Sequence, residues 1–317
     1  MKILLWIKNN LIVSILISMA IGIITGYFLD VSRLKNLILP LTFLLVYPMM
    51  VTLNFKSLLE KTNYKLQAST QIINFIVFPI LAYGIGYIFF LNDPYLRLGL
   101  LLIALLPTSG MSISWTAMAK GNVHEVIRMV VIGLMLGAIL TPLFITVFLG
   151  AEVDVPFLTI FTQIVIVVFV PLILAYMTQK ILIRKYSEEI FHKTIKPKFP
   201  LISTLGVVIM IFVAISLKAK VIVNNPELLP KIIIPLILFY FLMFIISILS
   251  ARVFFNRNDG IALVNGSLIR NLSLALAIAL SAFPSAGIAA LLIAIAYVIQ
   301  VQIAAWNVKL SKYLFKE

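Results

Sequence analysis

Apolar runs long enough to cross a bilayer dominate this sequence, and they leave few folds open to it. Ten runs approach or exceed the ~20 residues that a helix needs to span about 30 Å of hydrocarbon. They lie near residues 11–29, 36–54, 66–91, 97–119, 127–149, 157–183, 201–223, 231–255, 259–282 and 285–308. Because hydrocarbon offers the backbone no hydrogen bonds, such a chain must satisfy these groups internally. We therefore expect an all-α membrane protein with ten transmembrane helices.

The composition agrees with this class and excludes several others. The 317 residues are 62% hydrophobic and only 11% charged, whereas about a quarter of the residues in soluble domains are charged. Cysteine is absent, so the chain has no disulfide framework, thiolate metal site or nucleophilic thiol. The N-terminal run is too long for the apolar region of a signal peptide, and we expect it to remain as the first span.

The basic residues predict how the spans are oriented. The formal net charge is +14, but the Lys and Arg residues stand in short runs between apolar segments, which indicates topology and not nucleic-acid binding. Of the 25 Lys and Arg residues, 18 fall at the termini and around the loops after even-numbered spans, and 6 fall around the opposite loops. The positive-inside bias then predicts a multi-pass protein of the cell membrane with both termini in the cytoplasm.

One arginine lies inside the ninth run. Arg270 stands about 16 Å along a helix from Asp259, near the middle of the bilayer. A charge at that depth costs ~2.5 kcal/mol or more and indicates a functional site by default. Its neighbours form hydrogen bonds or loosen a helix: Asn265, Gly266, Ser267, Asn271 and Ser273. We expect the helix to break here, around Gly266, and its polar residues to line a site.

The fourth run carries a second expected break. Pro107 removes a backbone donor, and Ser109 with Gly110 weakens the helix further. Ser112 opens a series of hydroxyl residues at every second position, and these cannot all share one helical face. In membrane helices such residues often bond only to carbonyls of their own helix, which is the alternative for each of them.

The two halves of the chain share a spacing. Residues that mark corresponding places in the two halves are 160 positions apart. This offset relates Gly110 in the fourth run to Arg270 in the ninth. Five spans per half would invert the second copy, an arrangement that brings discontinuous helices together at the membrane midplane. We predict two inverted five-helix repeats, residues 1–150 and 151–317, in which helices 4 and 9 are discontinuous and cross.

Acidic residues are missing from the middle of the runs. All eleven Asp and Glu residues and both histidines fall in loops or at run ends. A proton-coupled carrier usually has a buried carboxylate or histidine, and a metalloenzyme needs a ligand set. We therefore expect no enzyme, no metal and no cofactor, and a substrate that is an anion or an oxygen-rich neutral molecule. Asn74 in the third run must point inward, where substrate contact and helix joining are both open to it.

The segment PTSGMSISWTAMAKGN, from Pro107 to Asn122, resembles a motif of the bile acid:sodium symporter superfamily, which includes the arsenite exporters of arsenical resistance. That motif runs Pro-Gly-Gly, then Ser, then Thr and Ala-Lys/Arg-Gly-Asn. The ninth run resembles the Gln-Asn pair of the family, with Arg270 in place of glutamine and Asn271 as the match. The resemblance implies a panel domain and a core domain, with spans four and nine crossing at their breaks beside the substrate.

The departures from this family concern its ions and its substrates. The symporters hold sodium with side chains that correspond to Gly266, Ile113 and Gly133, none of which has a side-chain oxygen. The arsenite exporters use a cysteine and a glutamate that correspond to Thr108 and Gln300. The resemblance therefore implies neither the sodium binding of the symporters nor the arsenite binding of the exporters in full. The arginine of the ninth span can take the place of a sodium charge at the carbonyl ends of the half-helices.

The predicted function is secondary active transport of an organic or inorganic anion by alternating access, without the usual sodium sites. The expected partners are a small anionic solute and the lipid bilayer. Six residues are predicted to line the substrate: Arg270, Asn271, Asn265, Ser109, Ser112 and Asn74. Two alternatives are a sodium-independent arsenite-type exporter and a membrane scaffold or sensor that transports nothing. In the scaffold, Arg270 would be a structural counter-charge.

Overall fold

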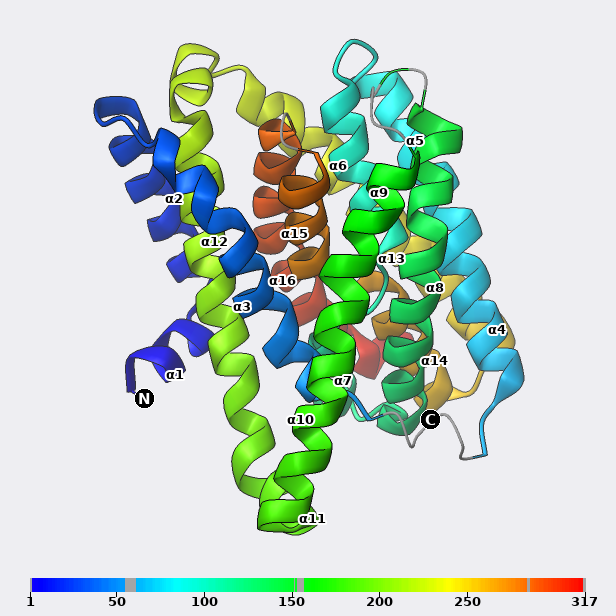
Figure 1. The fold of residues 1–317 in the computed structure, drawn as a ribbon. Coiled ribbons are helices and arrows are strands. Elements are labelled where there is room, and N and C mark those ends of the chain that lie inside the picture. The colour runs from blue at the N-terminus through cyan, green and yellow to red at the C-terminus, as the bar shows by residue number, and fades with distance from the viewer. Residues whose placement is uncertain (1, 55–60, 151, 153–156, 284–285, 316–317) are drawn as a thin grey trace. The chain divides into compact units, whose positions relative to one another are not determined.

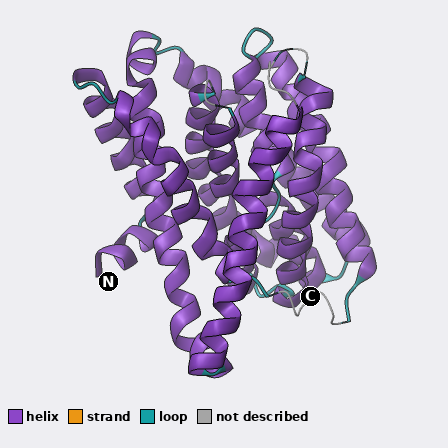
Figure 2. Ribbon diagram, in the orientation of Figure 1, coloured by secondary structure: helices purple, strands orange, loops and turns teal. Residues whose placement is uncertain are grey.

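The computed structural model describes residues 2–54, 61–150, 152, 157–283 and 286–315. Every regular element in these segments is helical (Figure 1 and Figure 2), which confirms the all-α prediction for them. Within the described residues, eight segments are long and apolar enough to cross a membrane. They are Leu11–Phe28, Ser32–Val51, Tyr64–Phe89, Val123–Leu149, Phe161–Tyr186, Glu188–Asn224, Leu228–Phe254 and Gly287–Leu314. The remaining two apolar runs are each divided between two shorter helices.

The chain forms two compact units that alternate along the sequence. Unit 1 comprises Met1–Thr52, Val155–Leu229 and Ser273–Ala294, and unit 2 comprises Leu53–Asp154, Pro230–Leu272 and Ile295–Glu317. Each half of the sequence contributes to both units, so the units are not the two sequence halves.

Unit 1 is built from long helices that approach closely through small residues. Its helices are α1 (Lys2–Asn9), α2 (Leu11–Phe28), α3 (Ile38–Val51), α9 (Phe157–Ile164), α10 (Val170–Tyr186), α11 (Glu188–Ile190), α12 (Phe199–Asn224) and nearly all of α15 (Leu272–Ala282). In α2, Gly26 lies so near the carbonyl of Ser216 in α12 that no β-carbon would fit. Ser18 donates to the carbonyl of Val208 at 2.6 Å. Such small and hydroxyl residues hold helices together where lipid supplies no hydrophobic drive.

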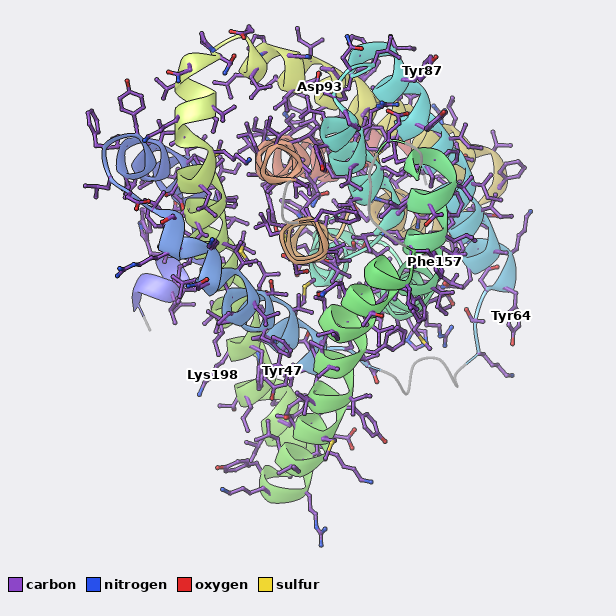
Figure 3. The ribbon with its side chains drawn as sticks, turned by 45° about the horizontal axis from the view of Figure 1, so that its top comes forward. Tyr47, Tyr64, Tyr87, Asp93, Phe157 and Lys198 are labelled. Carbon is purple, nitrogen blue, oxygen red and sulfur yellow. The ribbon has the colours of Figure 1, made fainter. Side chains whose placement is uncertain are left out.

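Unit 2 contains the helices around Arg270. They are α4 (Tyr64–Ile72), α5 (Phe78–Phe89), α6 (Pro94–Leu105), α7 (Gly110–Met118), α8 (Val123–Leu149), α14 (Arg257–Leu268) and most of α13 (Leu228–Phe254) and α16 (Gly287–Leu314). A π-helical turn, η3 (Ile73–Val77), joins α4 to α5. It comes just before Pro79, which cannot donate to a preceding carbonyl, and widened turns accommodate such a loss. Exposed Tyr64 and Tyr87 lie towards opposite ends of this span (Figure 3).

Candidate functional site

Two helix breaks meet inside unit 2. The segment between α6 and α7 contains Pro107, and the segment between α14 and α15 contains Arg270. These two residues form an isolated antiparallel bridge. Next to it, the N–H of Asn271 donates to the carbonyl of Leu106 at 2.8 Å. The two breaks are therefore in contact, and a backbone carbonyl that one break leaves free accepts a hydrogen bond from the other, as burial in hydrocarbon requires. We call the place where they meet the crossing.

The first break follows from its own residues and from a glycine opposite. Pro107 has no N–H to continue the helix, and Thr108 adopts the left-handed region at φ 51°. The hydroxyl of Thr108 donates to the carbonyl of Met129 in α8 at 3.2 Å. A β-carbon at Gly133 of α8 would lie 2.8 Å from that hydroxyl oxygen. Glycine at this position therefore lets the break pack directly against α8.

The helix after the first break is capped by two buried serines. Gly110 is the first residue of α7, and the Oγ of Ser109 accepts the N–H of Met111 at 3.3 Å. The N–H of Ser109 in turn donates to the Oγ of Ser112 at 3.3 Å, which completes a reciprocal capping box. Both hydroxyl oxygens are thus used as acceptors. Their own protons have no acceptor among the described residues.

The guanidinium of Arg270 lies fully buried where α6 and α14 end. Its Nε donates to the carbonyl of Ile103 at 3.0 Å, and Nη2 donates to the carbonyl of Ala104. Its Nη1 donates to the carbonyl of Ser267 at 2.9 Å and to Oδ1 of Asn74 at 2.7 Å. A guanidinium has five N–H groups, so four are engaged. All four acceptors are neutral oxygens.

These contacts cap the C-terminal ends of two helices at once. The last four carbonyls of a helix lack partners within it, and Arg270 serves two such carbonyls of α6 and one of α14. Asn74 serves another, because its Nδ2 donates to the carbonyl of Gly266 at 3.1 Å. Gly266, expected at the break, lies inside α14 just before its end. Each helix C-terminus carries about half a negative charge, so the two together offset roughly one positive charge.

The amide of Asn74 is held in one orientation. Its oxygen faces the guanidinium and its nitrogen faces the carbonyl of Gly266, so a flipped amide would set donor against donor. The residue lies in the π-helical turn η3, and such turns are frequent at functional sites. The ring of Phe78 follows, with its centre 5.6 Å from the Arg270 guanidinium carbon, within the range of a cation–π contact.

A glutamine of α16 holds the backbone of Arg270. The Oε1 of Gln300 accepts the N–H of Arg270 at 2.8 Å, and its Nε2 donates to the carbonyl of the same residue at 3.2 Å. Tyr240 of α13 donates its hydroxyl to the same Oε1 at 3.0 Å. The sequence marked Gln300 only as the position of the exporters' glutamate, and it gave no reason to include Tyr240. A lone tyrosine in an apolar run carries no signal of such a contact.

Asn265 and two of its neighbours lie around this crossing and keep unused hydrogen-bonding atoms. Asn265 of α14 accepts a bond of 3.0 Å from Asn307 of α16. Its own Nδ2, the Oδ1 of Asn307 and the hydroxyl of Ser267 are buried without a partner among the described residues. Asn271 is also buried. Unused polar atoms inside a protein are costly, so the site can accept further hydrogen bonds.

A second polar site, which we call the carboxylate cluster, lies at the N-terminal ends of α8 and α14. The carboxylate of buried Glu125 accepts bonds from the hydroxyl of Thr62 at 2.8 Å and the amide nitrogen of Gln67 at 2.6 Å. The N–H of Asn63 donates to it at 3.1 Å. Arg128, also buried, forms an ion pair with it at 3.0 Å. This carboxylate is therefore matched by a full opposite charge.

Asp259 is the other carboxylate of the cluster. It accepts the side-chain nitrogens of Asn122 at 2.7 Å and of Asn63 at 3.0 Å. Asn122 and Asn256 are the N-caps of α8 and α14, and each accepts the N–H of the acid three residues later. The sequence placed both acids at run ends but did not predict their burial. The pattern Asn-x-x-acid before an apolar run is the signal that could have revealed it.

A cavity with basic walls lies at the far end of α7. Its volume is about 300 Å³. Lys120, Arg257 and Lys312 contribute its charges, and no acidic residue lines it among the residues that the structure describes. No group of three His, Cys, Asp or Glu residues that could hold a metal occurs in the described part of the chain.

Comparisons with known proteins assign the chain to a family. The chain is 27% identical over 221 residues to the arsenical-resistance protein Acr3 of Alkaliphilus metalliredigens, covering 65% of this chain and 61% of that protein. It is 25% identical over 265 residues to Acr3 of Corynebacterium glutamicum, covering 75% and 70%. Sodium/bile acid cotransporter 7 of Danio rerio is 29% identical over 153 residues, covering 47% and 44%. The model of the Sodium Bile acid symporter family matches residues 39–225, more than half of the chain, and the protein therefore belongs to that family.

Proposed function

We propose that this protein is a secondary carrier that moves a small anion across the cell membrane by alternating access. The observation that carries the proposal is the crossing of two helix breaks at Pro107 and Arg270 among buried polar side chains. Paired discontinuous helices build the substrate sites of many carriers. Relatives named as an arsenical-resistance protein and a bile acid cotransporter support solute transport over catalysis. The mechanism needs no covalent chemistry.

We further propose ten spans arranged as two inverted five-helix repeats, residues 1–150 and 151–317. In this arrangement α6 with α7 forms the fourth span, and α14 with α15 forms the ninth. Two observations support it. The two breaks, at residues 106–109 and 269–271, lie 162 to 163 positions apart, close to the offset of 160 residues between Gly110 and Arg270. Unit 1 collects the first, second, sixth and seventh apolar runs, while unit 2 holds most of the others, which fits a panel and a core.

Cysteine labelling tests this topology, because the native chain has no cysteine. Asn92→Cys, in the turn between α5 and α6, should react with an impermeant maleimide only from outside. Asn258→Cys and Ser187→Cys should react only from the cytoplasmic side, where the termini are also expected. Five spans separate positions 92 and 258 in the proposed arrangement. Labelling of both from the same side would contradict it.

The six predicted residues divide into two roles in this proposal. Arg270, Asn74 and Asn271 shape the crossing, and the guanidinium supplies the positive charge. Asn265, Ser109 and Ser112 offer donors that have no acceptor among the described residues and can bind the oxygens of a solute. The N-terminal end of α7 adds a positive partial charge. The basic cavity at the other end of α7 would attract anions towards the carrier.

We propose that transport does not depend on sodium. The positions that resemble sodium ligands are occupied by tight packing. A β-carbon at Gly266 would collide with the sulfur of Met129, and Gly133 faces the hydroxyl of Thr108 at close range. Transport should therefore be the same in sodium and in choline at equal ionic strength. A saturable dependence on sodium would contradict this part of the proposal.

An arsenite-type exporter is the second candidate function, because the alignments to Acr3 proteins cover 65% and 75% of this chain. The groups at the positions of the exporters' cysteine and glutamate have other partners here. Thr108 bonds to a carbonyl of α8, and Gln300 holds the backbone of Arg270. Arsenite would then be handled as an oxygen-rich neutral solute and not through a thiolate.

Reconstitution into proteoliposomes tests the proposal. A substrate screen by thermal shift on the purified protein would first select anions that raise its melting temperature, with arsenite included. Labelled flux of the best compounds would then be compared with that of empty liposomes. Flux of an organic or inorganic anion supports the first candidate, and flux of arsenite alone supports the second. Binding without any flux would indicate a membrane scaffold or sensor.

A further inference from the structure

The cavity at the far end of α7, which we call the basic cavity, is built by three segments that pack closely. They are the residues just after α7, the start of α14 and the C-terminal end of α16. Three basic and three buried residues among its walls matter here: Lys120, Arg257 and Lys312, and Ala119, Ser311 and Phe315. The N–H of Asn122 donates to the carbonyl of Asn258 at 2.9 Å, and a β-carbon at Gly260 would lie 2.8 Å from the ring of Phe315. The walls are therefore held in place by contacts of the protein itself.

The three basic side chains of the cavity have no acidic partner among the described residues. No ion pair joins Lys120, Arg257 or Lys312 to a described carboxylate. Asp259 follows Arg257 by two residues, but its oxygens accept bonds from Asn63 and Asn122 instead. The three charges line a space of about 300 Å³, which is at the lower end of the range for small-molecule sites.

Lys120 occupies a backbone position that favours glycine. Its φ is 58°, in the left-handed region where a side chain is strained, and the residue in this conformation after a helix is most often glycine. The helix does not need the lysine as a cap, because the backbone N–H groups of residues 119–121 bond to the carbonyls of residues 115–117. Strained residues cluster at binding sites. The side chain of Lys120 lines the basic cavity, and binding there is the role that its position leaves for it.

We propose that the basic cavity binds a phosphate monoester, supplied either by the headgroup of an anionic lipid such as phosphatidic acid or by a soluble phosphorylated molecule. Basic pockets between membrane helices on the cytoplasmic side bind lipid phosphate groups, and this is the side proposed to be cytoplasmic. Trp306 and Tyr313 are exposed near the same end of α16, and such aromatic residues are typical of the depth of lipid headgroups. The cavity shares no lining residue with the crossing, so this site does not rest on the proposed carrier function.

The balance of charges favours a monoester over a diester. The cavity has three positive charges, and the carboxylate cluster beside it has one net negative charge, because Arg128 balances one of its two acids. Two helix C-terminal ends and one N-terminal end add roughly half a negative charge. About 1.5 positive charges remain, and a phosphate monoester carries about −1.5 to −2 at pH 7, whereas a diester carries less. The planar fork of Arg257 can bind two phosphate oxygens at once, and the two lysines act as point charges.

Melting temperatures of the full-length protein in detergent test the site with a soluble probe. Glycerol 3-phosphate, the soluble counterpart of the phosphatidic acid headgroup, is titrated at constant ionic strength. It should raise the melting temperature of wild type saturably, by roughly 2–5 °C. The affinity should fall about tenfold in Arg257→Gln, which loses charge-assisted hydrogen bonds, and less in Arg257→Lys, which keeps the charge without the fork.

A second set of measurements tests the lipid as the source. The protein is placed in phosphatidylcholine nanodiscs that contain phosphatidic acid, phosphatidylglycerol or neither. Phosphatidic acid should raise the melting temperature of wild type more than phosphatidylglycerol, which is a diester, and Arg257→Gln should abolish this difference. A response to the lipid alone assigns the headgroup as the ligand, whereas a response to glycerol 3-phosphate shows that the cavity also admits a free phosphate group.

Two lysines of α16 provide a matched pair of variants, both on exposed residues whose loss does not threaten folding. Lys312→Gln removes a charge from the cavity and should weaken binding several-fold, whereas Lys309→Gln removes one from outside it and should respond as wild type. No response to either probe would overturn the proposal, and so would equal responses of wild type and Arg257→Gln or equal losses in the two lysine variants. Equal effects of the two anionic lipids would overturn the assignment to a monoester. Melting is measured without flux, so a failure of the carrier proposal leaves this result unchanged.

Discussion

Helix α14 has a buried carboxylate near its start and a buried guanidinium just past its end, and the two charges are stabilised in different ways. Asp259 and Glu125 in the carboxylate cluster accept hydrogen bonds from side chains, and Glu125 also pairs with Arg128. Arg270 meets three backbone carbonyls and one amide. Charge faces charge at Glu125, whereas charge faces dipoles at Asp259 and at the crossing. The difference determines what each site loses when its central residue is neutralised.

The largest effect is expected for Glu125→Gln. This change strands Arg128, which is as deeply buried as Arg270, without the carboxylate that balances it. Removing one partner of a buried ion pair costs about 3–5 kcal/mol, which the fall in melting temperature should reveal. Neutralising both residues, as Glu125→Gln/Arg128→Gln, should recover part of the loss. Similar melting temperatures for Glu125→Gln and wild type would show that the pair is not the basis of the cluster.

A smaller loss of stability is expected for Arg270→Gln, although the Arg270 guanidinium contacts no carboxylate among the described residues. No charged partner is stranded, and the cost is roughly 1–3 kcal/mol for unmet hydrogen bonds. Arg270→Lys keeps the charge but loses the planar fork, so folding should largely survive. Substrate affinity should fall for both variants, measured as the rise in melting temperature that substrate induces. If both bind as tightly as wild type, Arg270 is a structural counter-charge and the substrate lies elsewhere.

The contrast between the two sites also explains what the sequence could predict. Long apolar runs indicate membrane helices because lipid permits little else, and a proline beside Ser109 and Gly110 indicates a break. The partners of Arg270 could not be predicted. Ile103 and Ala104 contribute backbone carbonyls, and any residue at those positions offers the same group. Whether these carbonyls reach the guanidinium depends on where α6 and α14 end relative to each other, and no local sequence pattern predicts that.

A still smaller loss of stability is expected for Asp259→Asn, and this difference distinguishes the two acids of the carboxylate cluster. Asp259 forms no ion pair among the described residues, unlike Glu125. Asp259→Asn keeps one good acceptor and strands no cation, so its stability loss should be about 1 kcal/mol. The measurement is the same melting experiment, with Glu125→Gln beside it. Equal losses for the two variants would mean that the cluster acts as one charge and that Arg128 serves both acids.

The smallest effect on stability is expected where charges face solvent. Lys312→Gln removes one basic residue from the wall of the cavity, and an exposed substitution of this kind changes stability by no more than about 0.5 kcal/mol. The rate of anion transport should change more than stability does, because a cavity lined by charges of one sign concentrates ions of the opposite sign. We expect a two- to threefold lower rate at low ionic strength, an order-of-magnitude figure for the loss of one of three charges. The loss should shrink at 0.5 M salt, where the Debye length is shorter than the roughly 10 Å of a 0.1 M solution.

Lys309→Gln is the matched control for that variant. Lys309 lies in the same helix, one turn earlier, and is exposed but does not line the cavity. The Lys309→Gln substitution removes one positive charge from the same end of α16, as Lys312→Gln does. If the cavity attracts the substrate, Lys312→Gln slows transport at low salt and Lys309→Gln leaves it nearly unchanged. Equal slowing by both would assign the attraction to the basic surface as a whole. The selection of an anion would then begin only at the crossing, where the guanidinium is already surrounded by carbonyls.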